Sequence, residues 1–228
     1  MVFCALPLRR SAGLAAALTT TACVGLAALA PITRAATPTP KVVEVPSRPA
    51  FVKPAAGGEK PAQVGQLLSQ QTVLRTAKPG RMQVQLPDGR AFRLGGDALL
   101  RLNGRQLDLQ RGQIIAWVNP GSKGGAPLQI RTRAATASIV GTTVFIEATD
   151  TELKIFSWEG LVECITADGQ RKTISSGQQL TFDNNAWRMT RLTTAEAAAR
   201  RQKSILLNGF TAPMETLPVI EKELGLSQ

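Results

Sequence analysis

Short segments in which apolar and polar residues alternate, each closed by a turn sequence, fill most of the chain after residue 63. In "RMQVQLPDGRAFRL", Met82, Val84 and Leu86 alternate with polar residues, and the pattern resumes after the "PDG" turn. Alternation with a period of two puts one set of side chains on one face of a strand, and Asp-Gly favours a hairpin turn. Turn signals recur about every ten residues, which is typical of all-β domains. The pattern predicts an all-β fold of short antiparallel strands, either a compact β-sandwich of jelly-roll type or a solenoid-like stack.

The chain also resembles itself. "LPDGRAFRLGGDALLRL" and "TADGQRKTISSGQQLTF" align without gaps when Asp88 is placed on Asp168. Two copies are too few for a solenoid array. They predict two similar hairpin systems stacked face to face. The aligned apolar pairs are Leu94 with Ile174, Leu100 with Leu180, and Leu102 with Phe182.

Residues 1–35 have the pattern of a targeting segment. Arg9 and Arg10 precede an uncharged stretch that is rich in Ala, Leu and Thr, and "ITRAAT" offers a cleavage site after Ala35. The prediction is a signal peptide, with an uncleaved N-terminal membrane anchor as the alternative. Both interpretations place the rest of the chain outside the cytoplasm.

Three further regions follow. Prolines recur through residues 36–63, which predicts a semi-extended linker. The β domain is expected over residues 64–192. In residues 193–228, Thr193 stands three positions before Glu196 in a capping-box arrangement, and Gly209 is a stop signal, so we predict a helical C-terminal tail.

The composition excludes much catalytic chemistry. The chain has no His, so it has no His base, no Ser-His or Cys-His pair and no His metal ligand. Cys164 is the single Cys after residue 35, and we interpret it as a small buried strand residue. No hydrolase elbow and no metal-ligand spacing is present. The sequence predicts a protein that is not an enzyme, with no catalytic, cofactor-binding or metal-binding residues.

Two groups of acidic residues are candidate sites. Asp150, Glu152 and Glu159 are close enough in sequence for a weak Ca²⁺ site, with a solvated loop as the alternative. Glu159 and Asp183 are the carboxylates that a glycosidase mechanism would need, and no sequence pattern supports that pairing. We therefore predict neither activity.

Residues 37–228 carry 24 Lys and Arg against 16 Asp and Glu, a net charge of +8. The positive residues are scattered and few aromatic residues lie among them, so nucleic-acid binding is not expected. Anionic envelope polymer or lipid head groups are the partners that such a charge would favour, and a solvated surface is the alternative.

The stretch "ATASIVGTTVFIEA" poses a choice between a ligand-contacting loop and a structural corner. Gly141 permits an unusual backbone angle, and Thr142 and Thr143 can bond local backbone groups. Val144 and Ile146 then enter the inner face of the next strand. We interpret the stretch as a corner. Trp117 and Trp158 stand beside turns and are expected to cap the ends of the core, with stacking on a sugar as the alternative.

The ordered set of these motifs resembles the FecR domain family. The matching elements are "LQIRT", "VGTTVF", "EGLV" and "SGQQ", preceded by "LPDGRAFRL" and "LQRGQIIAWV". Together they cover about residues 64–182. The structural motif residues carried over are Gly141, Thr142, Phe145, Glu159, Gly160 and Gly177.

The resemblance implies an extracytoplasmic sensing module. FecR itself is a membrane-spanning regulator of a sigma factor, and its outer part senses an outer-membrane transporter. Here about ten residues precede the apolar stretch, so we expect the extracytoplasmic module alone, without the sigma-regulating cytoplasmic segment. The expected function is that of a periplasmic or secreted sensing or protein-binding module with an envelope protein as partner. The alternative is a structural adaptor that binds anionic envelope polymer, and contact with the membrane is expected only if residues 1–35 are retained.

Overall fold

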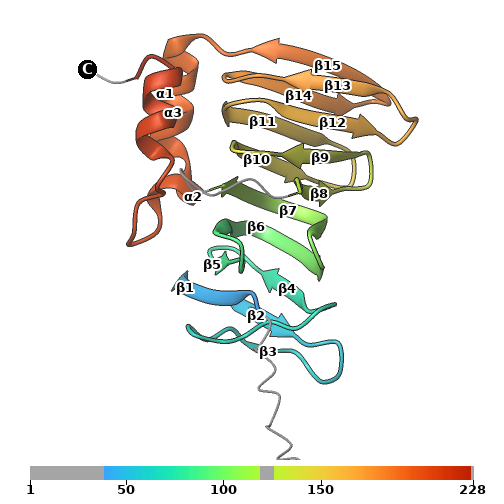
Figure 1. Ribbon diagram of the computed structural model, residues 1–228, viewed down its shortest axis with the longest axis vertical. Coiled ribbons are helices and arrows are strands. Elements are labelled where there is room, and N and C mark those ends of the chain that lie inside the picture. The colour runs from blue at the N-terminus through green and yellow to red at the C-terminus, as the bar shows by residue number, and fades with distance from the viewer. Residues whose placement is uncertain (1–38, 119–125, 227–228) are drawn as a thin grey trace, which may run out of the picture. The chain divides into compact units, whose positions relative to one another are not determined.

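The structure is a computed structural model, and it describes residues 39–118 and 126–226. The predicted signal peptide or anchor lies outside the described residues. The described residues form fifteen strands that are linked by pairing into one continuous sheet (Figure 1). The strands of the first half are β1 (Lys41–Ser47), β2 (Ala50–Lys53), β3 (Lys60–Pro61), β4 (Val73–Thr76), β5 (Arg81–Gln85), β6 (Arg90–Asn103) and β7 (Gln106–Val118). Those of the second half are β8 (Leu128–Arg131), β9 (Ala135–Ile139), β10 (Thr143–Ala148), β11 (Leu153–Glu159), β12 (Val162–Thr166), β13 (Arg171–Ile174), β14 (Gln178–Asp183) and β15 (Ala186–Arg191).

The long hairpin of β6 and β7 divides this sheet into two layers. The first half of β6 pairs with β5 and its second half pairs with β4. The first half of β7 pairs in parallel with β8, and its second half pairs antiparallel with β10. The pairing partners change near Gly95 and Gly112, where the register of the hairpin shifts.

We call the two layers sheet one and sheet two. Sheet one runs β1, β5, β6, β7, β10, β11, β14, β15, and sheet two runs β3, β2, β4, β6, β7, β8, β9, β12, β13. Alternate residues of both layers enter one hydrophobic core, among them Leu94 and Ile146 from sheet one and Leu100 and Ile130 from sheet two. The predicted all-β fold of antiparallel strands is confirmed, with the β7–β8 pair as a parallel exception.

The internal similarity corresponds to two hairpin systems. In the first copy β6 passes from sheet one to sheet two, and in the second copy β13 in sheet two is followed by β14 in sheet one. The crossing points are the aligned residues Asp97 and Gly177, which both have positive φ, 61° and 76°. The aligned residues Leu94 and Ile174 are both fully buried.

The structure differs from the predicted linker over residues 36–63, because β1, β2 and β3 lie within that range. β1 pairs with β5, β2 pairs with β4, and Val42 and Val52 are buried in the core. Proline does not prevent this, because β1 and β3 are edge strands, and an edge strand has backbone N–H groups that no neighbour needs. The β domain therefore begins well before residue 64.

The C-terminal tail is helical, as predicted. It contains α1 (Thr194–Lys203), α2 (Ile205–Asn208) and α3 (Leu217–Glu223). The capping box is present, with Thr193 Oγ1 accepting from the Glu196 amide and a Glu196 carboxylate oxygen accepting from the Thr193 amide at 2.8 Å. Figure 1 shows the helices gathered on one side of the strands. None of the described helices has the length and apolar character needed to cross a membrane.

The helices cover part of the outer face of sheet one. A second hydrophobic cluster lies there, separate from the core between the sheets. The domain thus has three layers, which are sheet two, sheet one and the C-terminal segment. The strands supply Ala91, Ile115, Trp117, Phe156 and Trp158 to this cluster, and the C-terminal segment supplies Leu206, Leu207, Met214 and Ile220.

Candidate functional site

Most of the predicted motif residues meet at one end of sheet one. Gly141 and Thr142 form the turn before β10, and Gly160 follows β11. The Gly160 amide donates to Ser176 Oγ at 2.9 Å, and the Gly177 amide donates to the Ser157 carbonyl at 2.9 Å. We call this group the polar corner; it comprises Gly141, Thr142, Thr143, Glu159, Gly160, Ser176 and Gly177.

All three glycines of the polar corner have left-handed backbone angles, and Gly177 has φ 76°. Gly141 has φ 63° and Gly160 has φ 75°. A Cβ at Gly141 would meet no atom within 4 Å, whereas one at Gly160 would lie 2.6 Å from Thr142 Cγ2. The corner interpretation of "VGTT" fits this geometry, because Gly141 turns the chain and Thr142 packs beneath Gly160.

The threonines behave differently from the prediction that they bond local backbone. Thr143 Oγ1 lies 2.9 Å from a Glu159 carboxylate oxygen and 2.9 Å from Thr216 Oγ1. The buried Thr142 Oγ1 has no hydrogen-bond partner among the described residues. The polar contacts of this turn therefore reach across to β11 and to the C-terminal segment.

The polar corner is also where α3 docks. Glu223 accepts from Ser176 Oγ and from the Gly160 amide. Burial raises the pKa of Glu159, the Glu223 carboxylate raises this pKa further, and the hydrogen bond from Thr143 opposes the shift. Two carboxylates, those of Glu159 and Glu223, thus lie close together where α3 contacts the β domain.

A buried arginine holds the C-terminal segment from the other side. Arg93 of β6 is 0% exposed and donates to Gln83 Oε1 at 2.8 Å. It also donates to the carbonyls of Leu206 at 2.9 Å, Leu207 at 3.3 Å and Ala212 at 2.6 Å. Burial lowers the pKa of Arg93 to about 10, which leaves the guanidinium charged at neutral pH. The sequence did not indicate this role of Arg93, because alternation within a strand does not show which face of the sheet the C-terminal segment will cover.

A groove of about 410 Å³ lies between α1, α2 and the outer face of sheet one. Its floor comes from strands of the β domain, and its walls come from the C-terminal segment. We call it the outer-face groove. It is lined by Gln113, Phe145 and Trp158 from the strands and by Arg200, Lys203, Ser204, Ile205 and Leu206 from the segment.

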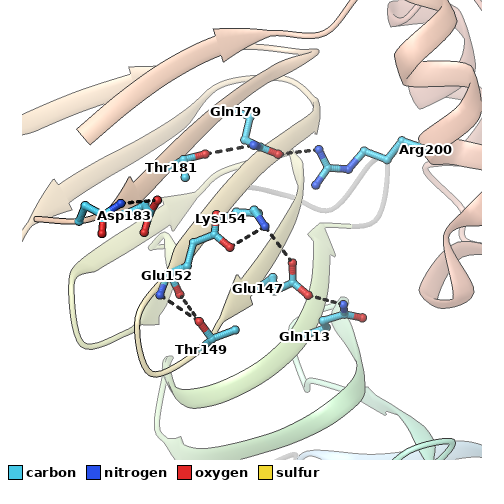
Figure 2. A network of polar contacts seen from close by, with 10 residues as sticks. Gln113, Glu147, Thr149, Glu152, Lys154, Gln179, Thr181, Asp183 and Arg200 are labelled. Atoms are coloured by element: carbon cyan, nitrogen blue, oxygen red, sulfur yellow. Dashed lines mark hydrogen bonds and ion pairs between the residues drawn. The ribbon is translucent and has the colours of Figure 1, made fainter. Parts of the chain in front are cut away.

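Arg200 is the principal charged group of the outer-face groove. Its guanidinium carbon lies 4.2 Å from the ring centroid of Phe156 and 5.3 Å from that of Phe145. Its Nη1 donates to Gln179 Oε1 at 2.6 Å, and Figure 2 shows the side chain reaching from the helix to β14. Burial lowers the pKa of Arg200, and the carboxylate of Glu147 opposes this shift.

The outer face of sheet two is different in character. Register places Arg101, Asp108 and Arg131 side by side on three neighbouring strands, and Lys53 and Arg171 lie in the same cross-strand row. The basic members of this row are exposed. We call it the basic row, and its exposed cations form an extended positive surface.

The acidic groupings do not form sites. Glu159 and Asp183 lie toward opposite ends of the β11–β14 pair, because Leu153 is paired with Phe182. Glu152 is engaged in an ion pair with Lys154 at 2.6 Å. Within the described residues no cluster of acidic or Cys side chains has the arrangement of a metal site.

Cys164 and the tryptophans are packing residues. Cys164 is fully buried in the core, and burial raises the pKa of its thiol to about 12. Trp117 and Trp158 do not cap the ends of the core as predicted. They lie on the outer face of sheet one in the second cluster, where Trp117 Nε1 donates to Glu215 Oε2 at 2.9 Å.

Two crystal structures from Parabacteroides distasonis ATCC 8503, each described as that of a "putative anti-sigma factor", are similar at 20% sequence identity. One match covers 49% of this chain and 55% of that chain with a TM-score of 0.42, and the other covers 54% and 61% with a TM-score of 0.45. The chain therefore spans about half to three fifths of those proteins. No curated protein sequence matches.

The family comparison agrees with the motif resemblance. Residues 72–163 match the family model described as FecR protein, a range that runs from the start of β4 into β12. It contains Gly141, Thr142, Phe145, Glu159 and Gly160, and it ends before Gly177 and the C-terminal helices. Residues 72–163 of this chain therefore carry a match to the FecR family model.

Proposed function

We propose that this protein is an exported, non-enzymatic FecR-domain protein that acts as a sensing or protein-binding module of the bacterial envelope. The FecR domain at residues 72–163 is the observation that carries the proposal, because the family is regulatory. The signal-like residues 1–35 support a periplasmic or secreted location, with a membrane-anchored form if that segment is retained.

The outer-face groove is the surface that we assign to partner binding. Its floor belongs to the FecR domain, whereas its walls belong to the segment after residue 193. It combines aromatic side chains with a positioned guanidinium, and aromatic residues and Arg are enriched at the centres of protein interfaces. A protein segment is therefore a better match for this groove than an extended polymer.

The test is capture of envelope proteins by the tagged chain exported from a Gram-negative host. A saturable complex that persists at about 0.5 M salt and is weakened by Lys203→Glu in the groove supports a protein-binding module. The matched control is Lys53→Glu, which makes the same charge change on sheet two. A complex that forms equally with both variants and the wild-type chain would remove the groove from the proposal, and absence of any saturable complex would contradict the function.

A second candidate function is a structural adaptor that binds anionic envelope polymer. The basic row favours it, since exposed cations on neighbouring strands give an extended positive surface. Binding to purified anionic polymer should then fall steeply with salt, because exposed charges are screened within about 8 Å at physiological ionic strength. The double variant Arg101→Gln/Arg131→Gln should weaken polymer binding, and Lys203→Glu should not.

A further inference from the structure

We infer that the outer-face groove recognises an acidic segment of a partner protein, in which an apolar side chain stands beside a carboxylate. The inference rests on the proposed protein-binding function and names the class of partner for the same groove. It is carried by three features, which are an apolar floor, a positioned guanidinium and an excess of positive over negative side chains around the groove.

The apolar part of the groove calls for an apolar anchor. Phe145 is half-buried on the floor, beside the buried Trp158. Ile205 on the wall is 47% exposed although it is a large aliphatic residue at the start of α2. An apolar side chain placed against Phe145 and Ile205 would remove both from water. Burial of apolar surface would favour binding by about 25 cal/mol per Å².

The charged part of the groove calls for a carboxylate. Stacking on Phe156 and the bond to Gln179 fix the plane of the Arg200 guanidinium. A guanidinium has five N–H donors, and among the described residues only Gln179 accepts from Arg200, so donors remain for a bidentate carboxylate. Lys203, one turn further along α1, is exposed and forms no ion pair within the described residues.

The nearby carboxylate of Glu147 does not line the groove and does not cancel both cations. Glu147 accepts from Gln113 Nε2 at 2.6 Å, and its other oxygen lies 3.8 Å from Lys154 Nζ. Figure 2 shows Glu147 held between Gln113 and Lys154, while Arg200 reaches Gln179 on a different strand. Arg200 and Lys203 together carry two positive charges against the single negative charge of Glu147, so the net charge around the groove is positive. This charge complements an acidic segment and opposes a basic one.

The size of the groove fits a short segment. A volume of about 410 Å³ is at the lower end of the range of ligand pockets, roughly 300–1,000 Å³. It has room for a few side chains of an extended peptide. The occupant that fits the groove is thus a linear acidic motif of the partner.

The experiment is a calorimetric titration of the full chain, as exported, with two blocked tetrapeptides. The acidic probe is acetyl-Glu-Leu-Asp-Phe-amide and the basic probe is acetyl-Lys-Leu-Lys-Phe-amide. The acidic probe should bind saturably and at least about tenfold more tightly than the basic probe, a ratio that corresponds to about 1.4 kcal/mol. Equal affinity for the two probes, or no saturable binding of the acidic probe, would overturn the inference.

Variants locate the site and keep the test independent of folding. Lys203→Glu changes an exposed side chain. It should lower the affinity for the acidic probe about five- to tenfold and raise the affinity for the basic probe. Ile205→Ser should lower the affinity for both probes, and Lys53→Glu on the basic row should change neither affinity. If Lys53→Glu lowers the affinity for the acidic probe and Lys203→Glu does not, the probe binds to sheet two and the inference is overturned.

The two proposals can fail separately. An envelope complex that depends on Lys203, together with no binding of the acidic probe, would leave the protein-binding function standing and overturn the acidic-segment inference. Binding of the acidic probe without any envelope complex would support the groove chemistry and contradict the proposed function.

Discussion

Adding a methyl group at Gly160 should destabilise the domain more than adding one at Gly141. Both residues have left-handed backbone angles, so each alanine variant has the same conformational penalty, roughly 1–2 kcal/mol for an L-residue. Part of this is offset because alanine also restricts the unfolded chain, by about 0.4–1 kcal/mol. Gly141→Ala, which has open space for its methyl group, should therefore cost about 0.5–1.5 kcal/mol.

Gly160→Ala has an additional steric term. Its methyl group would lie 2.6 Å from Thr142 Cγ2 and 3.4 Å from the Gly141 carbonyl oxygen. Overpacking of this kind typically costs 1–3 kcal/mol, so the expected total is roughly 2–4 kcal/mol. Thr142→Ser deletes the clashing methyl group and keeps the hydroxyl, and it should restore at least about 1 kcal/mol in the Gly160→Ala background.

The assay is urea unfolding of the four variants, with midpoints compared at unchanged m-values. A double-mutant cycle between Thr142 and Gly160 isolates the steric term, because residues in contact couple by about 0.5–3 kcal/mol. Equal costs for Gly141→Ala and Gly160→Ala, with no coupling to Thr142, would refute the packing of Thr142 beneath Gly160.

Three further predictions concern buried polar groups. Arg93→Lys keeps the charge but loses the planar fork, and it should cost roughly 2–4 kcal/mol and expose residues 204–216 to proteolysis. Because the pKa of Glu159 is raised above 4.5, the folded chain binds this proton more tightly than the unfolded chain, and stability falls as pH rises above about 4.5. The free energy of unfolding of Glu159→Gln in urea should therefore rise relative to that of wild type as the pH rises from about 4.5 to about 7. A difference between the two proteins that stays constant with pH would contradict this prediction. Cys164, with its thiol pKa raised to about 12, should resist thiol reagents at pH 8 until urea unfolds the chain.

The β domain was predictable because strand alternation and turn residues are local properties. The Asp88 and Asp168 turns, the aligned copies and the capping box at Thr193 all rest on residues a few positions apart. The strands within residues 36–63 were not predicted, because proline content alone cannot distinguish a linker from edge strands whose N–H groups need no partner.

The candidate site was predictable only in part, since its contacts join residues far apart in sequence. Glu159 was a predicted motif residue and Thr143 was part of the predicted corner, but their contacts with Thr216 and Glu223 depend on how α3 docks. Arg93 bonds carbonyls more than 110 positions away, and no local pattern distinguishes it from a solvated strand residue.

The outer-face groove is likewise built from residues that are far apart in the sequence. The FecR match ends at residue 163, whereas Arg200, Lys203 and Ile205 come from the segment beyond it. Arg93 on one side and the polar corner on the other hold that segment against strands of the FecR domain. In this chain the strands thus supply an aromatic floor, while the segment that follows sets the charge of the wall. If that division is correct, exchanging the charge at residue 203 should change which peptide binds and leave the urea midpoint unchanged. A large loss of stability in Lys203→Glu would show instead that the wall is part of the fold and not a separable determinant of specificity.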